Sequence, residues 1–575
     1  MKNAEIAAAL DELADLNELD GAVVYRVVAY RQAARSVRES PVAIGQLAEQ
    51  GRLTRLQGIG KTIEEKIETL LETGEIPAAT KLKRKFPAGL VALTRLPGLG
   101  PKTARKLYEE LRVSSLEELR EAAQAERLRD VPGLGAKFEQ NVLEALKTPI
   151  ERASDRHLLS HVLPLAERIV DELRAHPAAD KVELAGSLRR WTDTCKDIDI
   201  IATSQRPREL AQALTELEVV LEGRAPSDSG ASVVTHTGVA VDLRIVAPEQ
   251  FGNVLQHLTG SKQHNMALRE YAVKRDLHVS EYGVKDDKTG EKHACASEHE
   301  VYSLLGLDYI EPELREGRGE VEAARRHQLP KLIEEDDLKG DLHCHTIASD
   351  GRNSVDEMAR AARECAYKYL AITDHSASFG FGDDVQPDEL LRQVERVRKL
   401  NEGKRGFKLL IGSEVNILPD GSLDYPDDVL AELDWVIASV HSSFRMGEKA
   451  MTERIMAAMD HDLVDAIGHP TGRKILKRDP YSLDIERIVE HAAATGTMLE
   501  INGNPDRRDL SDLHARLAVE AGVTVVVNSD AHGTDTLRLI KFAVETGRRA
   551  WLTSDQVANT RSLRELKKLR KRARR

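Results

Sequence analysis

The amino-acid sequence predicts a multidomain protein of mixed α+β and α/β class, with helical domains first and a parallel barrel last. Three patterns support this prediction. Before residue 150, a glycine turn followed by a helical segment occurs three times. Between residues 181 and 248, short strands alternate polar and apolar residues. After residue 338, apolar runs that end in His, Asp or Glu alternate with helical segments, as in a sheet or barrel with ligands at its carboxyl edge.

Size and composition agree with this prediction and exclude several classes. The chain has 575 residues, enough for roughly three to five domains, and its 31% charged and 41% hydrophobic residues exclude a disordered protein. No apolar run is long enough to span a membrane, and the acidic helix predicted at the N-terminus is not a secretory signal. Four cysteines without a CxxC spacing indicate a reducing environment, so we expect a cytoplasmic protein.

The net charge of −12 conceals a strongly basic C-terminal tail, Arg561–Arg575. Acidic residues gathered at metal sites account for part of the negative total and leave basic surfaces available for nucleic acid. The tail is predicted to be either a solvated helix end or an arm that contacts phosphates.

The three glycine turns lie in LQGIGKTIEEKI (56–67), LPGLGPKTARKLYEEL (96–111) and VPGLGAKFEQNVLEAL (131–146). Such turns direct backbone N–H groups and a helix N-terminus toward a phosphate without reading bases. They resemble the helix-hairpin-helix motif of DNA-repair proteins, and the alternative is a helical bundle whose glycines only cap helices. The residues predicted to bind DNA are Gly58, Gly60, Gly98, Gly100, Gly133 and Gly135.

An acidic triad follows in the middle of the chain. In KDIDIIA (196–202) the alternation places Asp197 and Asp199 on one face of a strand. THTGVAVDLRIVAP (235–248) is predicted to be a hairpin about Gly238 whose second strand carries Asp242. Three carboxylates on adjacent strands suit two Mg²⁺ ions, which assist the attack of a 3′-hydroxyl on a triphosphate.

These motifs resemble those of the family X DNA polymerases, the group that contains DNA polymerase β. The resemblance rests on GS-x-RR at 186–190 followed by D-x-D, and on HLTGSKQHNMALR (257–269), which is similar to the family's thumb segment. YRVVAYRQAARSVRE (25–39) resembles the family's lyase domain. The resemblance covers residues 1 to about 315 and implies a nucleotidyltransferase palm and a thumb.

The resemblance implies roles for individual residues. Asp197, Asp199 and Asp242 would be catalytic metal ligands, with Asp242 accepting the proton of the primer hydroxyl. The sequence departs from the family at His257-Leu258, where a Tyr-Phe pair usually screens the ribose, so sugar discrimination stays open. The residues implied in nucleotide binding are Gly186, Ser187, Arg189, Arg190, Gly260, Ser261, Lys262, Asn265 and Arg269.

A lyase role is implied less completely. Lys66 falls at the position of the family's Schiff-base lysine, but Arg26 and Thr62 replace two supporting lysines. A Schiff-base lysine needs neighbouring cations or desolvation to lower its pKa. Lys66 is therefore a candidate lyase residue, and the alternative is a lysine that only solvates its helix.

The C-terminal pattern predicts a second metal site. His343 and His345 lie two apart on a strand, so both imidazoles reach one ion. Imidazoles mixed with carboxylates suit Zn²⁺, Mn²⁺ or Fe²⁺, and nine candidates imply two or three ions, bridged in part by Glu414, for phosphoester hydrolysis. Asp374 is expected to support a ligand instead. The candidates are His343, His345, Asp350, His375, Glu414, His441, His469, Asp530 and His532.

This ligand order resembles the polymerase and histidinol phosphatase (PHP) domain, which implies a distorted (β/α)7 barrel. Seven strands can be counted in the pattern. Arg473 and Arg445 are candidates for contact with a substrate phosphate. The charged segment 316–337 contains few apolar residues and is predicted to be a long linker.

Together the resemblances imply a bacterial-type family X polymerase, a group often called PolX. We expect template-directed, gap-filling synthesis in base-excision repair and a 3′–5′ exonuclease in the PHP domain, with abasic-site endonuclease or 3′-phosphatase activity as further options. Expected partners are DNA and dNTPs, with no membrane, and the chain is expected to be a monomer. The alternatives are a small-molecule phosphatase whose N-terminal half only binds DNA, and a non-catalytic DNA-bridging protein.

The predicted domains follow from the same motifs. They are a lyase-like helical domain with the first hairpin (1–85), a fingers-like domain with two hairpins (86–150), the palm (151–248), the thumb (249–315), the linker (316–337) and the PHP domain with its basic tail (338–575).

Overall fold

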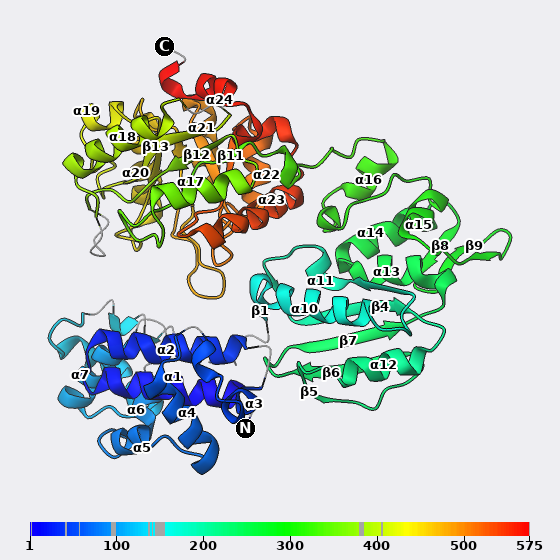
Figure 1. Cartoon of the computed structure of the whole chain (residues 1–575), viewed down its shortest axis with the longest axis horizontal. Helices are drawn as coiled ribbons and strands as arrows, with labels where there is room; N and C mark the ends of the chain where they lie inside the picture. Colours follow the sequence, from blue (N-terminus) through cyan, green and yellow to red (C-terminus); the bar gives the residue numbers. More distant parts are fainter. Residues whose placement is uncertain are drawn as a thin grey trace. The chain divides into compact units, whose positions relative to one another are not determined.

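The computed structural model describes residues 1, 3–40, 43–56, 58–93, 99–135, 138–140, 142–143, 156–378, 384–403 and 406–573 (Figure 1).

 The residues outside this description are 2, 41–42, 57, 94–98, 136–137, 141, 144–155, 379–383, 404–405 and 574–575. The chain forms two compact units. One contains Met1–His157, His161–Leu184 and Lys196–Ala247, and the other contains Leu158–Ser160, Ala185–Cys195 and Pro248–Arg575. The predicted domain boundaries remain predictions.

The N-terminal region is helical, as the sequence predicts. Its core consists of apolar residues at helical spacing, among them Leu10, Leu13 and Ala33, which are fully buried. The elements are α1 (Asn3–Leu19), α2 (Val24–Glu39), α3 (Ile44–Glu49), η1 (Leu53–Arg55), α4 (Lys61–Thr73), α5 (Pro77–Lys83), α6 (Ala88–Leu93), α7 (Pro101–Leu111), α8 (Leu116–Gln124) and η2 (Leu128–Asp130).

The predicted palm is a five-stranded sheet with the order β2-β4-β7-β6-β5. Strands β4 and β7 are parallel, and the other neighbours are antiparallel. The hairpin predicted about Gly238 is present, with Gly238 at a φ of 83° between β6 and β7. The elements are β1 (His157–Leu158), α10 (Leu159–Arg174), β2 (Lys181–Leu184), α11 (Gly186–Arg189), β3 (Thr194–Cys195), β4 (Asp197–Thr203), α12 (Pro207–Thr215), β5 (Val220–Gly223), β6 (Gly230–Thr235) and β7 (Ala240–Ile245).

The thumb combines helices with a three-stranded antiparallel sheet of order β10-β9-β8. Leu268, Val301 and Tyr302 are buried in its core. The elements are η3 (Pro248–Gln250), α13 (Phe251–Thr259), α14 (Lys262–Val273), β8 (Leu277–Ser280), β9 (Gly283–Asp286), β10 (Lys292–His293), α15 (Glu298–Leu304) and η4 (Pro312–Leu314).

The segment predicted to be a linker, 316–337, is folded instead. It contains α16 (Glu320–Arg325) and η5 (Glu335–Asp337), and Val321 and Leu332 are buried in the thumb core. Its charges misled the prediction because some of them are buried in pairs. Glu320 is fully buried, and its Oε1 lies 2.7 Å from Nδ1 of His264, which is also fully buried.

The C-terminal domain is a nearly closed parallel barrel, which confirms the predicted (β/α)7 architecture (Figure 1). Its seven strands are neighbours in chain order, and a parallel bridge between Cys344 and Ala531 links the segments that follow the first and last of them. The strands are β11 (Gly340–Asp341), β12 (Tyr369–Ile372), β13 (Lys408–Asn416), β14 (Trp435–Ser439), β15 (Ala466–Ile467), β16 (Met498–Asn502) and β17 (Val525–Asn528).

Helices surround these strands, and a large apolar core packs between the two layers. The helical elements are α17 (Val355–Glu364), α18 (Pro387–Asn401), α19 (Asp427–Ala431), α20 (Glu448–Asp460), α21 (Ile485–Thr495), α22 (Asp512–Glu520), η6 (Thr534–Leu539), α23 (Ile540–Arg549), η7 (Ser554–Gln556), η8 (Ala558–Thr560), α24 (Leu563–Leu569) and η9 (Lys571–Ala573). Among the described residues, no helix has the length and apolarity needed to cross a membrane.

The basic tail is only partly a solvated helix end. Lys567 and Lys568 are exposed at the end of α24. Arg570 and Arg572, however, each place a guanidinium nitrogen 3.4 Å from a carboxylate oxygen of Asp465, which is fully buried. These two arginines therefore stabilise the barrel, because they neutralise a buried carboxylate.

Candidate active sites

The nine predicted metal ligands of the C-terminal domain come from the carboxyl ends of its strands. His343 and His345 follow β11, His375 follows β12, Glu414 lies in β13, His441 follows β14, His469 follows β15, and Asp530 and His532 follow β17. Asp350 lies in the loop after the first two histidines. Because parallel strands all end at one edge of the barrel, side chains far apart in the sequence meet there.

The structure brings eight of the nine together in three groups of ligand atoms. Within each group these atoms lie within 4.8 Å of one another, and His345 and His375 each belong to two groups. The groups are His345, Asp350, His375 and His532; His343, His345 and Asp530; and His375, Glu414 and His441. The ninth residue, His469, places Nε2 2.8 Å from Oε1 of Glu414. Their role as metal ligands remains a prediction.

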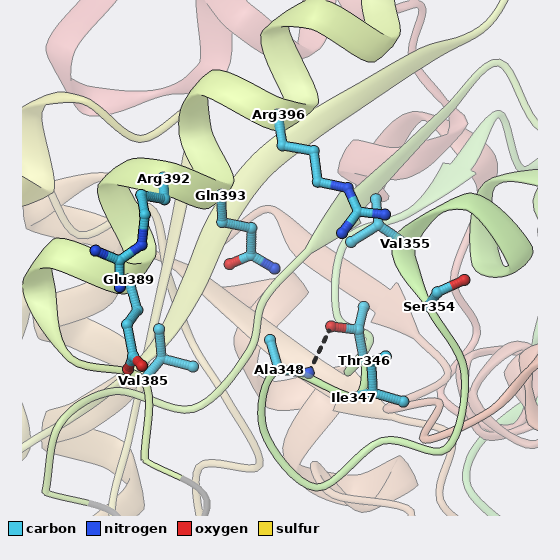
Figure 2. Close-up of a pocket in the computed structure, with 10 residues that line it drawn as sticks. All are labelled: Thr346, Ile347, Ala348, Ser354, Val355, Val385, Glu389, Arg392, Gln393 and Arg396. Atoms are coloured by element: carbon cyan, nitrogen blue, oxygen red, sulfur yellow. Dashed lines mark hydrogen bonds between the residues drawn. The ribbon is translucent and has the colours of Figure 1, made fainter.

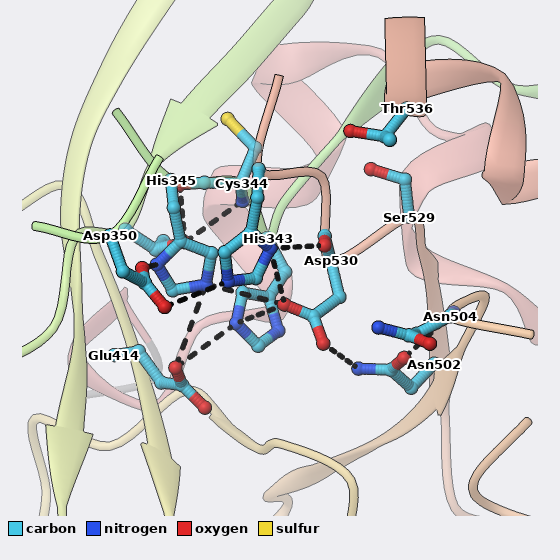
Figure 3. A network of polar contacts seen from close by, with 12 residues as sticks. His343, Cys344, His345, Asp350, Glu414, Asn502, Asn504, Ser529, Asp530 and Thr536 are labelled. Carbon is cyan, nitrogen blue, oxygen red and sulfur yellow. Dashed lines mark hydrogen bonds and ion pairs between the residues drawn. The ribbon is translucent and has the colours of Figure 1, made fainter. Parts of the chain in front are cut away.

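Glu414 lies at the centre of this arrangement and is 1% exposed. Its Oε2 is 2.9 Å from Nδ1 of His375, and its Oε1 is 3.1 Å from Nε2 of His441. Figure 3 shows Glu414 beside His343 and His345, whose Nε2 atoms lie 3.4 and 3.6 Å from Oε2. Burial raises the pKa of Glu414, but the surrounding histidines have the larger effect in the opposite direction. The pKa of Glu414 therefore lies well below its usual range. Glu414 is therefore ionised, and both of its oxygens lie close to imidazole nitrogens of other predicted ligands.

The residues present fit metal ions. Nε2 of His343 and both ring nitrogens of His345 are buried and have no hydrogen-bond partner within the part of the chain that the structure describes. Burial and the neighbouring His532 and His375 lower the pKa of His345 to about 4, so its imidazole is neutral and able to donate a lone pair. An orphaned buried nitrogen costs free energy unless a ligand occupies it.

Sequence reasoning missed Glu500, which supports two of the histidines. Nδ1 of His343 lies 2.7 Å from its Oε1, and the backbone N–H of His469 donates to its Oε2 at 2.7 Å. Such a carboxylate fixes the tautomer of an imidazole ligand. The signal in the sequence is an acid inside an apolar strand, MLEIN (498–502), but β16 carries no predicted ligand that would draw attention to this strand.

Asp374 has the supporting position that the sequence predicts. Its carboxylate accepts hydrogen bonds from the Thr346 N–H at 2.6 Å, from Ser349 Oγ at 2.8 Å and from Gln393 Nε2 at 2.7 Å. These bonds tie β12 to the loop that carries Asp350. A cavity of about 470 Å³ opens beside this loop, large enough for a nucleotide (Figure 2). Its lining includes Ile347 and Arg392.

The predicted palm triad lies on two adjacent parallel strands. Asp199 on β4 is the register partner of Asp242 on β7, and Asp197 lies two residues before Asp199 on the same face. Asp242 accepts a hydrogen bond from Ser232 Oγ and lines a cavity of about 600 Å³. A donor set made only of carboxylates fits Mg²⁺. The three groups of closely spaced ligand atoms described above do not include this triad.

The turn that was predicted to hold phosphates has its arginines engaged in ion pairs. Arg189 donates to both carboxylate oxygens of Glu298, at 2.9 and 2.7 Å. Nε of Arg190 donates to Glu316 at 3.0 Å. Both glutamates are distant in the sequence, so no local pattern indicates these pairs. Gly186 begins the turn with a φ of 63°, and Ser187 lies in α11.

The thumb residues predicted to contact the nucleotide lie around the N-terminus of α14. Ser261 caps this helix by accepting from the His264 N–H, and it follows Gly260, which has a φ of 67°. Lys262, the first residue of the helix, is exposed. Asn265 Nδ2 donates to the carbonyl of His257 at 2.8 Å, and Arg269 Nη2 lies 3.4 Å from Nδ1 of the same histidine.

Each described glycine turn of the N-terminal region precedes a helix. Gly60 and Gly100 are the N-caps of α4 and α7, and the carbonyl of Gly135 accepts from the Phe138 N–H at 2.9 Å. Gly58 and Gly133 have φ values of 81° and 78°. Gly98 lies outside the described residues. The candidate lyase residue, Lys66, is half-buried on α4.

Comparison with known families accounts for most of the chain. The family models that match are "Helix-hairpin-helix domain" at residues 1–76, "SAM-like Helix-hairpin-helix tandem" at 90–148, "DNA polymerase beta thumb" at 254–316 and "PHP domain" at 341–504. Fold and site therefore define a class: a polymerase β-like core joined to a PHP domain.

Comparison with individual relatives identifies the family within this class. The chain is 39% identical over 574 residues, all of both chains, to the "DNA polymerase/3′-5′ exonuclease PolX" of Bacillus subtilis (strain 168). It therefore belongs to the PolX family of bacterial family X DNA polymerases. A probable phosphatase of Thermoanaerobacter sp. (strain X514) is 33% identical over 231 residues, which are 38% of this chain and 89% of the relative. A probable phosphatase of Acetivibrio thermocellus is 32% identical over 202 residues, 33% of this chain and 78% of the relative.

Proposed function

We propose that the chain is a template-directed DNA polymerase with a 3′–5′ exonuclease in its PHP domain. The observation that carries this proposal is the identity along the whole chain to a protein that bears both activities in its name. The alternative, a small-molecule phosphatase with a binding module, is disfavoured because the phosphatase relatives match only about a third of the chain.

For synthesis, Asp197, Asp199 and Asp242 would hold Mg²⁺, which when bound neutralises the triphosphate and acidifies the primer hydroxyl. Asp242 would accept the proton of that hydroxyl, and Ser232 holds its carboxylate in place. Ser187 and Lys262 would bind phosphates of the dNTP. Arg189 and Arg190 would join them only by exchanging their glutamate partners for phosphate.

For hydrolysis, the histidine–carboxylate cluster would hold two or three ions, with Zn²⁺, Mn²⁺ and Fe²⁺ as the candidates. Bound there, the ions supply a nucleophilic water and neutralise the phosphodiester. The chain's part is to orient the ligands: Glu500 holds His343, and Asp374 holds the loop of Asp350. Abasic-site cleavage or 3′-phosphatase activity would use the same cluster.

The proposal extends to the setting of these activities. The glycine turns would hold the DNA backbone. The protein would act as a monomer in base-excision repair, where the palm site would fill the gap and the PHP site would trim the 3′ end. All four cysteines are free thiols, which suits a reducing cytoplasm. A lyase step at Lys66 remains a candidate.

Primer extension across a one-nucleotide gap tests the polymerase proposal. With Mg²⁺ and dNTPs, the wild-type chain should add the templated nucleotide, and Asp242→Ala should add none. Extension that ignores the template base, or that Asp242→Ala retains, would refute it. Digestion of the same end-labelled DNA without dNTPs measures the exonuclease in parallel.

A further inference from the structure

A short basic hairpin follows the ligand His469. The N–H of Lys474 donates to the carbonyl of Arg478 at 2.8 Å, and the reverse bond from the Arg478 N–H measures 2.7 Å. We call residues 474–478 the basic hairpin, since three of its five residues are cations. Leu476 lies at its tip with a φ of 60° and is 53% exposed. This exposed apolar side chain, flanked by cations, lies outside the apolar core of the domain.

The basic hairpin is attached to the metal-ligand cluster through Arg507. The Ile475 N–H donates to the carbonyl of Asp506 at 2.7 Å, which fixes the hairpin beside the segment that carries Arg507. Nε of Arg507 lies 3.9 Å from Oδ2 of the predicted ligand Asp530. Arg473, which the sequence suggests for phosphate contact, donates to the carbonyl of Arg507 at 2.8 Å and so positions this segment.

Positive charge in this region exceeds what its carboxylates neutralise. Lys477 pairs with Asp506, and Arg478 donates to the carbonyl of Gly472 and lies 4.3 Å above the Phe444 ring. Within the described ranges, no carboxylate lies within 4 Å of the Lys474 ammonium. Burial and the nearby Arg507 and Arg478 lower the pKa of Lys474. Holding cations together in this way is unfavourable until an anion joins them.

We propose that the basic hairpin binds the backbone of the DNA strand whose 3′ end is cleaved at the cluster. Arg507 contacts the phosphate next to the scissile one, Lys474 contacts the following phosphate, and Leu476 packs against a nucleoside beyond it. A small phosphomonoester would need only the cluster, whereas a row of cations leading away from it matches a chain of phosphates. This inference rests on the proposed exonuclease function.

Two substrates of different length separate the hairpin from the cluster. One is a 5′-labelled single-stranded 15-mer, and the other is the p-nitrophenyl ester of thymidine 5′-monophosphate, which reaches only the cluster. Lys474→Met keeps the aliphatic stem and removes the charge, and Leu476→Gly removes the side chain at a φ that glycine prefers. Lys449→Ala, an 84% exposed lysine on α20, is the matched control.

Lys474→Met should raise KM for the 15-mer by about tenfold, the loss of one charged contact. It should also reduce the slope of log(kcat/KM) against log[salt] by about 0.7, the value for one phosphate of a single strand. Leu476→Gly should raise KM for the 15-mer and leave the salt slope unchanged. Both variants should hydrolyse the ester within twofold of wild type, and Lys449→Ala should match wild type on both substrates.

Other outcomes overturn the inference. Wild-type KM and salt slope in Lys474→Met would exclude a phosphate contact, and equal losses on DNA and ester would place the effect in the cluster. The same melting temperature in all variants verifies folding; should Lys474→Met unfold, Leu476→Gly alone decides by its ratio of DNA to ester activity. A wild-type chain that hydrolyses the ester but not DNA refutes the proposed exonuclease itself, which is a different result from either of these.

Discussion

Glu298→Gln tests the ion pairs that hold the turn at residues 186–190 against the thumb. The Glu298 carboxylate is 4% exposed and accepts hydrogen bonds from Arg189 and from Arg315, which is itself fully buried. Burial raises the pKa of Glu298, but the two guanidiniums lower it more, to about 2. Relative to an ordinary value of 4.5, this shift corresponds to about 3 kcal/mol of stabilisation at pH 7.

The substitution keeps the shape of the side chain and leaves the buried Arg315 and the half-buried Arg189 without their counter-charge. Removing one partner of a buried pair costs about 3–5 kcal/mol, which agrees with the value from the pKa. The assay is hydrogen–deuterium exchange of α15 and η4, because a chain with several domains does not unfold in one step. Protection of these elements should fall by about 3 kcal/mol. Glu322→Gln, which removes an exposed carboxylate from the same region, is the control and should change little.

The stabilisation that Glu298 contributes decreases as the pH falls. Because the pKa of Glu298 is lowered on folding, its contribution is complete above pH 4.5 and is lost as the pH falls toward 2. Glu298→Gln should therefore lose less protection than wild type between these pH values. A loss below about 1 kcal/mol at pH 7, together with unchanged acid sensitivity, would refute a desolvated pair.

Three further predictions concern the barrel and the segment that pairs with it. Glu500→Gln should weaken metal binding by about 10- to 100-fold in a metal titration, because His343 loses the carboxylate that orients it, and unchanged affinity would contradict that role. A chelator should lower the melting temperature of the barrel, and Mn²⁺ should restore it. An ion at a hundredfold its Kd adds about 2.7 kcal/mol to the free energy of unfolding. A chelator without effect would argue against resident ions. Asp193→Ala should lower the exchange protection of residues 186–195 by about 2–4 kcal/mol. The reason is that Arg473 and the buried Arg508 lose the carboxylate that they contact at 2.9 and 3.3 Å. Wild-type protection in this variant would contradict the role of Asp193.

The sequence predicted the parts of the site that local patterns define. Strand periodicity placed Asp197 and Asp199 on one face, and the register of β4 with β7 then set Asp242 beside Asp199. The ligand-ended strands predicted the barrel because each parallel strand ends at the same edge. These inferences needed only the spacing within one strand and the direction of its neighbours.

Contacts between distant segments were not predictable in this way. Glu298 is 109 residues from Arg189, and no local pattern pairs them. Charge also misled the prediction of a linker at 316–337, because composition does not reveal whether a residue such as Glu320 is solvated or buried against His264. Arg507 was missed for the same reason, since its position beside Asp530 depends on the neighbouring loop.

The central claim is that one chain contains two independent metal-dependent sites, one for synthesis and one for hydrolysis. The most direct test is a single reaction series on end-labelled gapped DNA, in which extension and shortening of the primer are measured for Asp242→Ala and His343→Ala. Asp242→Ala should lose extension and keep shortening, and His343→Ala should lose shortening and keep extension. Loss of both activities in either variant would contradict the claim.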